Sequence, residues 1–429
     1  MNSRLPHRLL VLTLLLSWQA AAEAQGLFNF ERKPIDYHNQ VAKNPVSRLQ
    51  ENILSGKVQL EYQGPRGYLD SFLKQLDVSQ TTQALVFSKS SLQLHRIAPP
   101  RPRAIYFNDN VYVGWVQGGD VLEIIAADPS LGTVFYTLKQ QDVPFPRFTR
   151  DRGQCLQCHA NRRTKQVPGP VVRSLFTQIN GQPVFNLGSF VSDHTSPFSR
   201  RWGGYYVTGT HGTMLHMGNM LVDRNTPLEE FDYQPGANVT DLSSRVNTRP
   251  YLTRHSDIVA LMVLEHQSQM QNLITQAHFE EIRGKYYDSA LSREEGFQSD
   301  FTKRRIFRAS EELLKYMLFF DEHPLSSPVK GTSGFTEEFS ARGPRDKLGR
   351  SLYQLDLQTR MFKYPMSYMI YTEAFKQLPP LTLAHLSRRL QEVLTAESTD
   401  DEFSHLDLET RKAILKIARE TCPLLTRNW

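Results

Sequence analysis

The sequence has few cysteines, no extreme charge and no long apolar run after its first residues, and each absence excludes a class of protein. Three cysteines in 429 residues are too few for a disulfide scaffold. A net charge of +6 without a Lys/Arg-rich run does not favour nucleic acid as a partner. Beyond the N-terminus no segment approaches the roughly 18 apolar residues of a membrane span, so we expect no transmembrane segment in the mature chain.

Motifs for nucleotide binding and for serine-type catalysis are also missing. The chain contains no P-loop, no dinucleotide fingerprint and no nucleophile elbow. The apolar fraction of 40% and the charged fraction of 22% are those of an ordinary globular protein. The sequence therefore indicates a folded protein without catalytic residues of these kinds.

The N-terminus has the three parts of a secretory signal peptide. Arg4 and Arg8 precede an apolar stretch from Leu9 to Ala22, and Ala22-Glu23-Ala24 forms a small-x-small cleavage site. We expect cleavage after Ala24, with an uncleaved membrane anchor as the alternative. Residues 1–24 thus predict export, which makes the mature protein periplasmic or secreted.

The segment CLQCH contains Cys155 and Cys158 with His159 directly behind them. Cys-x-x-Cys-His is the attachment signature of c-type haem: the two thiols form thioethers with the haem vinyl groups, and the histidine becomes the proximal iron ligand. Export suits this interpretation, since covalent haem attachment takes place outside the cytoplasm. A zinc half-site, a redox dithiol and a chance match are the alternatives. Cys422 is left over, and we expect it to be a free or buried thiol.

The longer segment CLQCHANRRTKQVPGP resembles the start of a c-type cytochrome. In small cytochromes c a Gly-Pro pair about a dozen residues past the haem histidine supplies a carbonyl to it. The resemblance implies that the carbonyl of Pro170, in Gly169-Pro170, accepts from His159 Nδ1. The block DHTSPFSRRWGGYYVTGTHG is similar to uncharacterised exported bacterial proteins with one haem motif, a resemblance that implies no activity.

Two parts of the sequence contain candidates for a second axial ligand of the iron. The block THGTMLHMGNM, residues 210–220, is Gly-rich, and its methionines follow His159 at a separation that resembles the His-to-Met separation of small cytochromes c. Within it His216 or Met217 is the favoured candidate. The other candidate is His266, which interrupts an apolar stripe on a predicted helix. Such a histidine is more often a core residue with satisfied hydrogen bonds.

Arginines close to the motif are candidates for binding the haem propionates. Arg200 and Arg201 are followed by Trp202, and a guanidinium pairs well with a carboxylate. Arg162 and Arg163, just behind the motif, have the same interpretation. Plain solvation at the surface is the alternative for all four. His194 lies in the sequence SDHTSPF, which predicts an Asx-type turn.

The order of patterns predicts an α+β fold, with strands first and helices later. Helices are expected at 44–56 and 67–76, followed by an antiparallel meander and, after the motif, a hairpin around Asn180-Gly181 and a strand at 203–209. From about residue 253 the pattern is helical, interrupted by a Gly/Pro/Ser-rich loop at 323–352. We expect a β-rich haem c-binding domain at 25–220 and a helical domain at 221–429.

These features together indicate an exported monohaem c-type cytochrome protein that carries single electrons to or from a redox partner protein. An electron carrier is favoured over a catalyst. The alternatives are a haem enzyme with an open sixth coordination site, acting on peroxide, a nitrogen oxide or an organic substrate, and a haem-based redox or ligand sensor. The extra helical half supports the enzyme alternative.

Overall fold

A computed structural model of the chain describes residues 29–223, 227, 231–291, 296–398, 402–427 and 429. The chain divides into two compact units, Met1–Val41 and Ala42–Trp429. The predicted signal peptide lies outside the described residues. In the first unit a short helix, η1 (Asn29–Glu31), precedes a loop in which His38 Nε2 lies 2.8 Å from Glu31 Oε1. The sheet, the remaining helices and the CLQCH motif all belong to the second unit.

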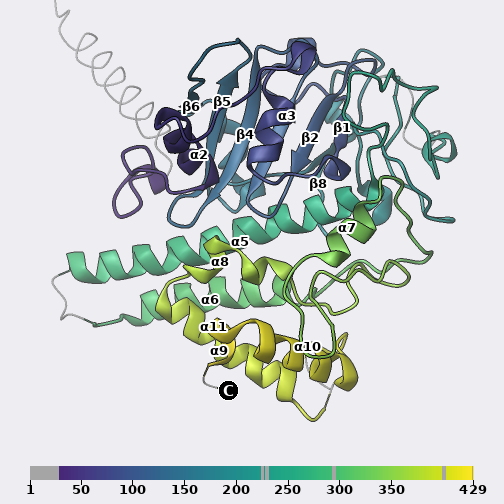
Figure 1. Cartoon of the computed structure of the whole chain (residues 1–429). Coiled ribbons are helices and arrows are strands. Elements are labelled where there is room, and N and C mark those ends of the chain that lie inside the picture. Colours follow the sequence, from purple (N-terminus) through teal and green to yellow (C-terminus); the bar gives the residue numbers. More distant parts are fainter. Residues whose placement is uncertain (1–28, 224–226, 228–230, 292–295, 399–401, 428) are drawn as a thin grey trace, which may run out of the picture. The chain divides into compact units, whose positions relative to one another are not determined.

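Within the described residues, six strands form an antiparallel sheet in which each strand pairs with the next one in the chain (Figure 1). The strands are β1 (Ala84–Val86), β2 (Arg103–Phe107), β3 (Val111–Trp115), β4 (Val121–Asp128), β5 (Gly132–Lys139) and β6 (Phe148–Arg150). The β3–β4 and β4–β5 turns contain Gly118 and Gly132, with φ values of 65° and 79° that favour glycine. The predicted meander is confirmed.

One face of this sheet is covered by α2 (Pro45–Leu54) and α3 (Leu69–Gln75). Asn44 caps the N-terminus of α2, as the sequence predicts, and its Nδ2 donates to the Tyr136 hydroxyl on β5 at 3.0 Å. On α3 the ring of Phe72 lies 5.5 Å from that of Phe148 on β6. Tyr136 and Phe148 lie on the same side of the sheet as Ile124, because their strands pair Ile124 with Tyr136 and Leu138 with Phe148.

The opposite face of the sheet carries Ile105, Glu123, Ile125 and Phe135, as the register shows by pairing Ile125 with Phe135. Part of this face packs against the 33-residue helix α5 (Ile258–Ala290), which lies along it (Figure 1). Ile105 and Ile125 nevertheless remain partly exposed, although they lie on inner strands. An antiparallel sheet can leave part of one face open to solvent, and this face does so at Ile105 and Ile125.

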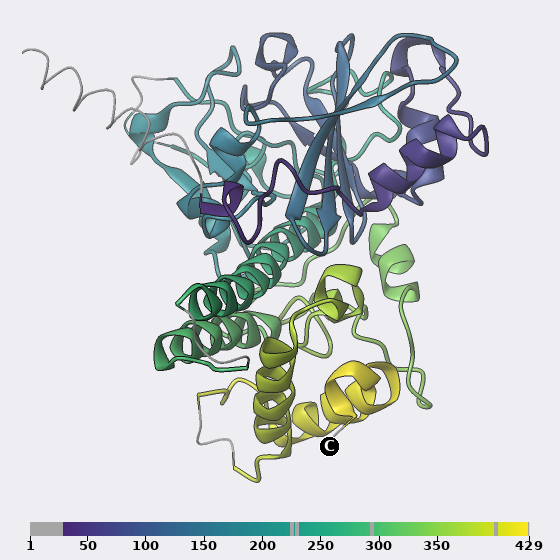
Figure 2. The ribbon, with the colours of Figure 1, turned by 90° about the vertical axis from the view of Figure 1, so that its left-hand side faces the viewer.

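Helices make up most of the second half of this unit. After α5 come α6 (Asp300–Met317), α7 (Phe335–Ala341), α8 (Glu373–Lys376), α9 (Pro380–Thr395), α10 (Leu408–Thr421) and α11 (Pro423–Thr426). Figure 2 shows α9 and α10 beside one another and α5 beside α6, and α6 also packs against α9. The protein is therefore α+β, as the sequence predicts. Among the described residues, no helix combines the length and apolarity needed to cross a membrane.

The apolar core continues from the sheet into the helices. One cluster of buried side chains includes Phe107 and Tyr112 of the sheet, Met262 of α5, and Leu390 and Ile414 of α9 and α10. Helix α5 is buried on several sides because it lies between the sheet and the other helices. The domain boundary at residue 220 stays a prediction. The apolar core is continuous across it, because this cluster contains side chains from both sides of residue 220.

Three segments differ in detail from the pattern-based expectations. The Asn180-Gly181 hairpin forms, with Gly181 at a φ of 84°, but its strands β7 (Arg173–Leu175) and β8 (Ser189–Val191) are short. Residues 203–209 form no regular strand; Tyr205 and Thr208 make only isolated bridges. The predicted loop at 323–352 contains α7. In each case contacts with distant parts of the chain, which periodicity does not detect, determine the local structure.

Candidate haem-attachment site

The CLQCH motif begins just after β6 and is tied to the sheet by one aspartate. Asp151 N–H donates to the carbonyl of Phe135 on β5 at 2.9 Å. Its Oδ2 accepts from the N–H groups of Gly153 and Cys155, both at 3.0 Å. This aspartate therefore fixes the point at which the chain turns from the strand into the motif.

The motif itself forms a single helical turn, α4 (Leu156–His159). The N–H groups of Cys158 and His159 donate to the carbonyl of Cys155 at 3.1 and 3.0 Å, and Leu156 is fully buried beneath the turn. The turn brings the two cysteines and the histidine into one short segment.

Both motif thiols are free, with Cys155 partly buried and Cys158 exposed. Burial, followed by the negative charges of Asp151 and Glu123, raises the pKa of Cys155 to about 12. Redox dithiols work through a thiolate whose pKa is lowered, so this environment does not favour the dithiol alternative. Among the described residues, no group of three or more His, Cys, Asp or Glu side chains is arranged to hold a metal ion.

The ring of His159 is oriented by a backbone carbonyl. Its Nδ1 lies 3.0 Å from the carbonyl oxygen of Gly169, and Gly169 N–H donates to the carbonyl of His159 at 2.9 Å. A carbonyl only accepts, so Nδ1 carries the proton and Nε2 is left as the nitrogen with a lone pair. Burial lowers the pKa of His159, which keeps the ring neutral at pH 7.

The acceptor for His159 is thus one residue earlier than the Pro170 carbonyl that the resemblance implies. The carbonyl of Pro170 instead accepts from Asn272 Nδ2 of α5 at 3.0 Å. A Cβ on Gly169 would lie only 1.8 Å from Asn272 Oδ1, so glycine is needed for this close approach. The loop behind the motif is also tied to α6 by the ion pair of Lys165 with Glu312.

The motif lies over the open part of the sheet face. The rings of His159 and Phe135 are 5.1 Å apart, and Phe135 is the cross-strand partner of the partly exposed Ile125. Arg103 on β2 pairs with Glu123 on β4 at 2.9 Å, and both charges affect the pKa of His159. An apolar floor and an arginine are therefore close to the histidine.

Arg173 on β7 brings a second cation to the motif. Burial, followed by the positive charge of Arg163, lowers the pKa of Arg173, and the nearby Cys158 acts in the opposite direction. Nη2 of Arg173 donates to Ser189 Oγ at 2.8 Å. The Nε atoms of Arg103 and Arg173 are buried and have no hydrogen-bond partner among the described residues. Sequence reasoning missed both arginines, since each lies in a strand far from CLQCH, and only the cross-strand register places Arg103 on this face.

The arginine pair chosen from the sequence is placed differently. Arg201 is 2% exposed, lies 3.3 Å from Glu265 of α5, and donates to the carbonyls of Ser196 and His194. Its guanidinium is therefore engaged in the interior. Arg200 is exposed and lies over the ring of Phe190 at 5.3 Å.

His216 and Met217, the favoured distal ligands, are both buried and both already bonded. His216 Nδ1 accepts from Gly218 N–H at 3.0 Å, and its ring packs 5.2 Å from that of Trp202. With Nδ1 as acceptor, Nε2 carries the proton of the neutral ring and has no lone pair for iron. The sulfur of Met217 accepts from Ser174 Oγ at 3.5 Å and packs in a small cluster with Phe176.

His266 has both ring nitrogens occupied. Its Nδ1 lies 2.8 Å from Nδ1 of His194, and its Nε2 lies 2.8 Å from Ser367 Oγ. The ring is stacked on Phe319 at 4.5 Å, and burial lowers the pKa of His266 to about 3. It has the satisfied core environment expected of a histidine in an apolar stripe. The Asx-type turn at His194 is confirmed by the bond from Thr195 N–H to Asp193 Oδ1, although His194 itself points into the core.

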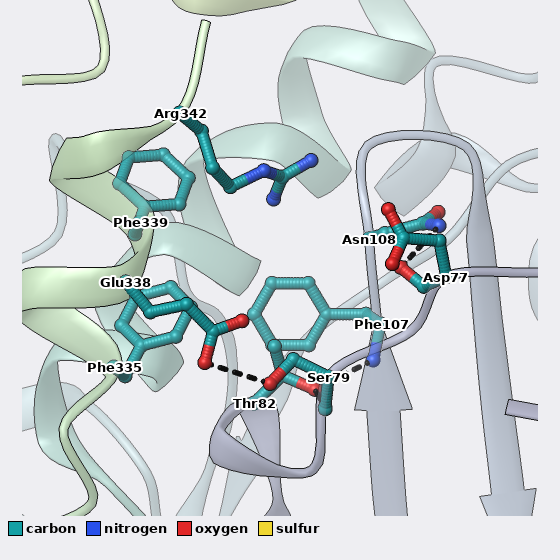
Figure 3. A pocket seen from close by; sticks show the side chains of 9 residues that line it. All are labelled: Asp77, Ser79, Thr82, Phe107, Asn108, Phe335, Glu338, Phe339 and Arg342. Carbon is teal, nitrogen blue, oxygen red and sulfur yellow. Dashed lines mark hydrogen bonds between the residues drawn. The ribbon is translucent and has the colours of Figure 1, made fainter. Parts of the chain in front are cut away.

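A separate cavity of about 150 Å³ lies between α7, the segment 77–82 and the end of β2 (Figure 3). It is smaller than the roughly 300–1,000 Å³ of pockets that hold drug-sized ligands. Glu338 accepts there from Ser79 Oγ at 2.9 Å. None of the site residues named above lines the cavity. The residues that line it are Asp77, Ser79, Thr82, Phe107, Asn108, Phe335, Glu338, Phe339 and Arg342.

Comparisons with known proteins found no matching family model, no matching curated protein and no matching solved structure.

Proposed function

We propose that the chain carries one haem c, joined by thioether bonds to Cys155 and Cys158, with His159 as the proximal iron ligand. The observation that carries this proposal is the orientation of His159. Its Nδ1 is bonded to the Gly169 carbonyl, which leaves Nε2 free to bind a metal. Ligating histidines in metal sites typically have their second nitrogen fixed in this way. When bound, the haem supplies a couple between ferrous and ferric iron that exchanges one electron.

The surroundings of the motif fit such a group. The two thiols are free, and His159 contacts Phe135 on the sheet face that also carries the partly exposed Ile105 and Ile125. Arg103 and Arg173 each have a buried Nε–H without a partner among the described residues, so each has a donor left for an anionic acceptor such as a propionate. We therefore propose these two arginines as the propionate ligands, in place of Arg201, whose guanidinium is engaged with Glu265.

Single-electron transfer to a redox partner protein is the function that we propose. The loop that holds His159 is anchored to both long helices, through Asn272 on α5 and through Glu312 on α6. A firmly held site suits electron exchange, because little rearrangement is then needed when the iron changes charge. The signal-peptide pattern of residues 1–24 supports a periplasmic or secreted location, where haem attachment and a partner would be found.

A haem enzyme or a ligand sensor is the second candidate, and one observation favours it. The ligand atoms of Met217 and His266 are engaged in hydrogen bonds, and His216 has the tautomer that does not bind iron. A sixth position without a protein ligand would be open to a small molecule such as peroxide or a nitrogen oxide.

The haem proposal is tested by expressing the full chain together with a cytochrome c maturation system. Covalent haem is detected by haem staining after denaturing electrophoresis, and we expect staining for the wild type. The double variant Cys155→Ala/Cys158→Ala should lose it, whereas Cys422→Ala should keep it. A wild-type chain that folds and is exported without covalent haem would contradict the proposal.

Spectra of the ferric and ferrous protein then separate the two functions. Low-spin iron in both states that does not react with carbon monoxide supports the electron carrier. High-spin iron that binds carbon monoxide readily supports the enzyme or the sensor. Single variants of His216, Met217 and His266 identify any distal ligand, because replacing the true ligand converts low-spin iron to high-spin iron. His95→Ala is the matched control, as His95 is exposed and lies outside the site.

A further inference from the structure

Two charged side chains lie on the same face of the sheet as the ring of Phe135. The register pairs Ile105 with Gly114 and Gly114 with Glu123, so Glu123 on β4 and Arg103 on β2 point to this face. Arg103 Nη1 donates to Glu123 Oε2 at 2.9 Å, and the two side chains are only 17% and 16% exposed. A largely buried ion pair therefore joins two inner strands across β3.

The ion pair crosses β3 at Gly114, where no side chain stands in its way. A Cβ on Gly114 would lie 3.4 Å from both Arg103 Cδ and Glu123 Cβ, so a larger side chain would compete with the pair for space. Glycine inside a strand weakens the strand, because it packs poorly and loses more entropy on folding. The sheet thus keeps this crossing at some cost to its own stability.

The carboxylate of Glu123 is held by donors on both oxygens. Its Oε1 accepts from Ser91 Oγ at 3.1 Å, and from the N–H and Nε2 of Gln93 at 3.3 and 3.2 Å. Its Oε2 accepts from Arg103. Four donors leave the carboxylate little freedom to move, so its charge has a fixed place on the sheet face.

Both charges lie close enough to the motif to act on its histidine. Glu123 precedes Ile125 by two residues on β4, and Ile125 is the cross-strand partner of Phe135, whose ring is 5.1 Å from that of His159. Strand spacing and rise place Glu123 about 8 Å from Phe135. Burial lowers the pKa of His159 and the Gly169 carbonyl raises it; of the two charges, Arg103 lowers this pKa and Glu123 raises it.

Stability alone does not account for the charges. A largely buried ion pair is often no more stabilising than apolar side chains of similar size. Glu123 also anchors residues 91–93, but a glutamine has the same shape and keeps one acceptor oxygen for that purpose. The negative charge itself is therefore the feature that needs a function.

We propose that Glu123 and Arg103 are positioning residues that set the reduction potential of the iron by acting on it in opposite directions. This inference rests on the proposed haem at Cys155, Cys158 and His159. Ferric iron carries one more positive charge than ferrous iron, so the carboxylate of Glu123 favours the ferric state and the guanidinium of Arg103 favours the ferrous state. The protein adjusts its potential through the balance between these two charges.

The test is an optical redox titration of the purified chain with covalent haem. A unit charge at about 10 Å changes the ratio of ferrous to ferric iron by roughly tenfold at an effective dielectric constant of about 20. For one electron, a tenfold change is about 59 mV. Glu123→Gln should raise the potential by about this amount and Arg103→Gln should lower it. The double variant should lie between the two single variants.

Charge-conserving variants separate charge from structure. Glu123→Asp and Arg103→Lys keep the charges and should keep the potential near that of the wild type. Circular dichroism shows whether each variant is folded. If Glu123→Gln does not fold, the two Arg103 variants decide, because they leave the bonds from Ser91 and Gln93 to Glu123 in place: Arg103→Gln must lower the potential and Arg103→Lys must keep it.

A matched control is the ion pair of Arg305 with Glu280, whose side chains are 27% and 19% exposed. Glu280 lies about 12 Å further along α5 than Asn272. Glu280→Gln and Arg305→Gln should change the potential much less than the Glu123 and Arg103 variants do.

Two results would overturn the proposal. One is a shift of Glu123→Gln and Arg103→Gln in the same direction, as a general disturbance of the site would produce. The other is a pair of shifts no larger than those of the Glu280 and Arg305 variants. A wild-type chain without covalent haem would instead remove the haem proposal on which this one rests, and haem staining distinguishes that failure from the other two.

Discussion

Replacing Gly169 with alanine tests the contact that holds the motif histidine. The added Cβ would lie 1.8 Å from Oδ1 and 2.9 Å from Cγ of Asn272, which is 1% exposed. Gly169 is not among the glycines with positive φ, so the backbone tolerates alanine and the steric clash is the source of the cost. Overpacking of this kind costs about 1–3 kcal/mol. Displacing Asn272 also removes the donor of the buried Pro170 carbonyl, at about 1–3 kcal/mol. We expect a total loss of about 2–6 kcal/mol in the free energy of unfolding.

The second variant of the pair, Asn272→Ala, makes the explanation specific. Alone it removes the bond to Pro170 and leaves a small cavity, which should cost about 1–3 kcal/mol. Combined with Gly169→Ala it also removes the atoms that clash with the new Cβ. The double variant should then be no less stable than Asn272→Ala alone, so the cycle should show a favourable coupling equal to the whole cost of Gly169→Ala, about 2–6 kcal/mol.

Guanidinium chloride unfolding is measured by tryptophan fluorescence for the wild type, the two single variants and the double variant. It gives the free energy of unfolding of each variant relative to the wild type. Costs that simply add, or a Gly169→Ala variant as stable as the wild type, would refute the packing argument. The spectra provide a second measurement when haem is attached. Because the Gly169 carbonyl orients His159, Gly169→Ala should alter the iron spectrum, whereas an exposed change such as His95→Ala should not.

Three further predictions concern ionisable groups away from the motif. Burial raises the pKa of Glu265 to about 8, so the folded state holds a proton that the unfolded state releases near pH 4.5. The free energy of unfolding should therefore fall as the pH rises from about 4.5 to 8. The denaturant midpoint of Glu265→Gln should fall much less over the same range. Burial alone would raise the pKa of Glu311, but hydrogen bonds from His385 and Arg389 lower it to about 2. Glu311→Gln should therefore be less stable than the wild type at neutral pH, and this difference in the free energy of unfolding should vanish as the pH falls from 4.5 towards 2. A difference that stays constant across that range would contradict the explanation. Arg411 is 1% exposed and donates to the carbonyls of Leu406, Val393 and Phe403. In thermal or denaturant unfolding Arg411→Met should lose about 3–5 kcal/mol of stability, and Arg411→Lys should lose less. Equal losses would show that the hydrogen bonds to the carbonyls do not matter.

Local sequence patterns predicted the elements that are stabilised locally. Asn44-Pro45 marks the start of α2, and the alternation in VLEIIAAD matches β4, because capping and side-chain alternation depend on neighbouring residues. The segment around Tyr205 looks like a strand by composition, yet it bridges β1 through Tyr205 and α5 through Thr208. Those contacts join residues more than 40 positions apart, which local patterns cannot reveal.

The candidate site shows the same limit. Cys155, Cys158 and His159 could be proposed from CLQCH alone because haem attachment requires a fixed local spacing. The acceptor for His159 depends on how the loop returns, and Gly169 rather than Pro170 reaches it because Asn272 of α5 holds Pro170. Arg103 could be placed near the motif only from the register of four strands. His266 and His194, 72 positions apart, form one buried pair that no spacing rule links.

Helix α5 connects two parts of the molecule that the sequence keeps apart. Asn272 of this helix donates to the carbonyl of Pro170 in the loop behind the motif, and Glu281, further along the helix, accepts from Thr382 N–H of α9. From Asn272 to Glu281 a helix rises by about 1.5 Å per residue, or about 14 Å in all. A change among the C-terminal helices that moves α5 along its axis would therefore also move the loop that orients His159.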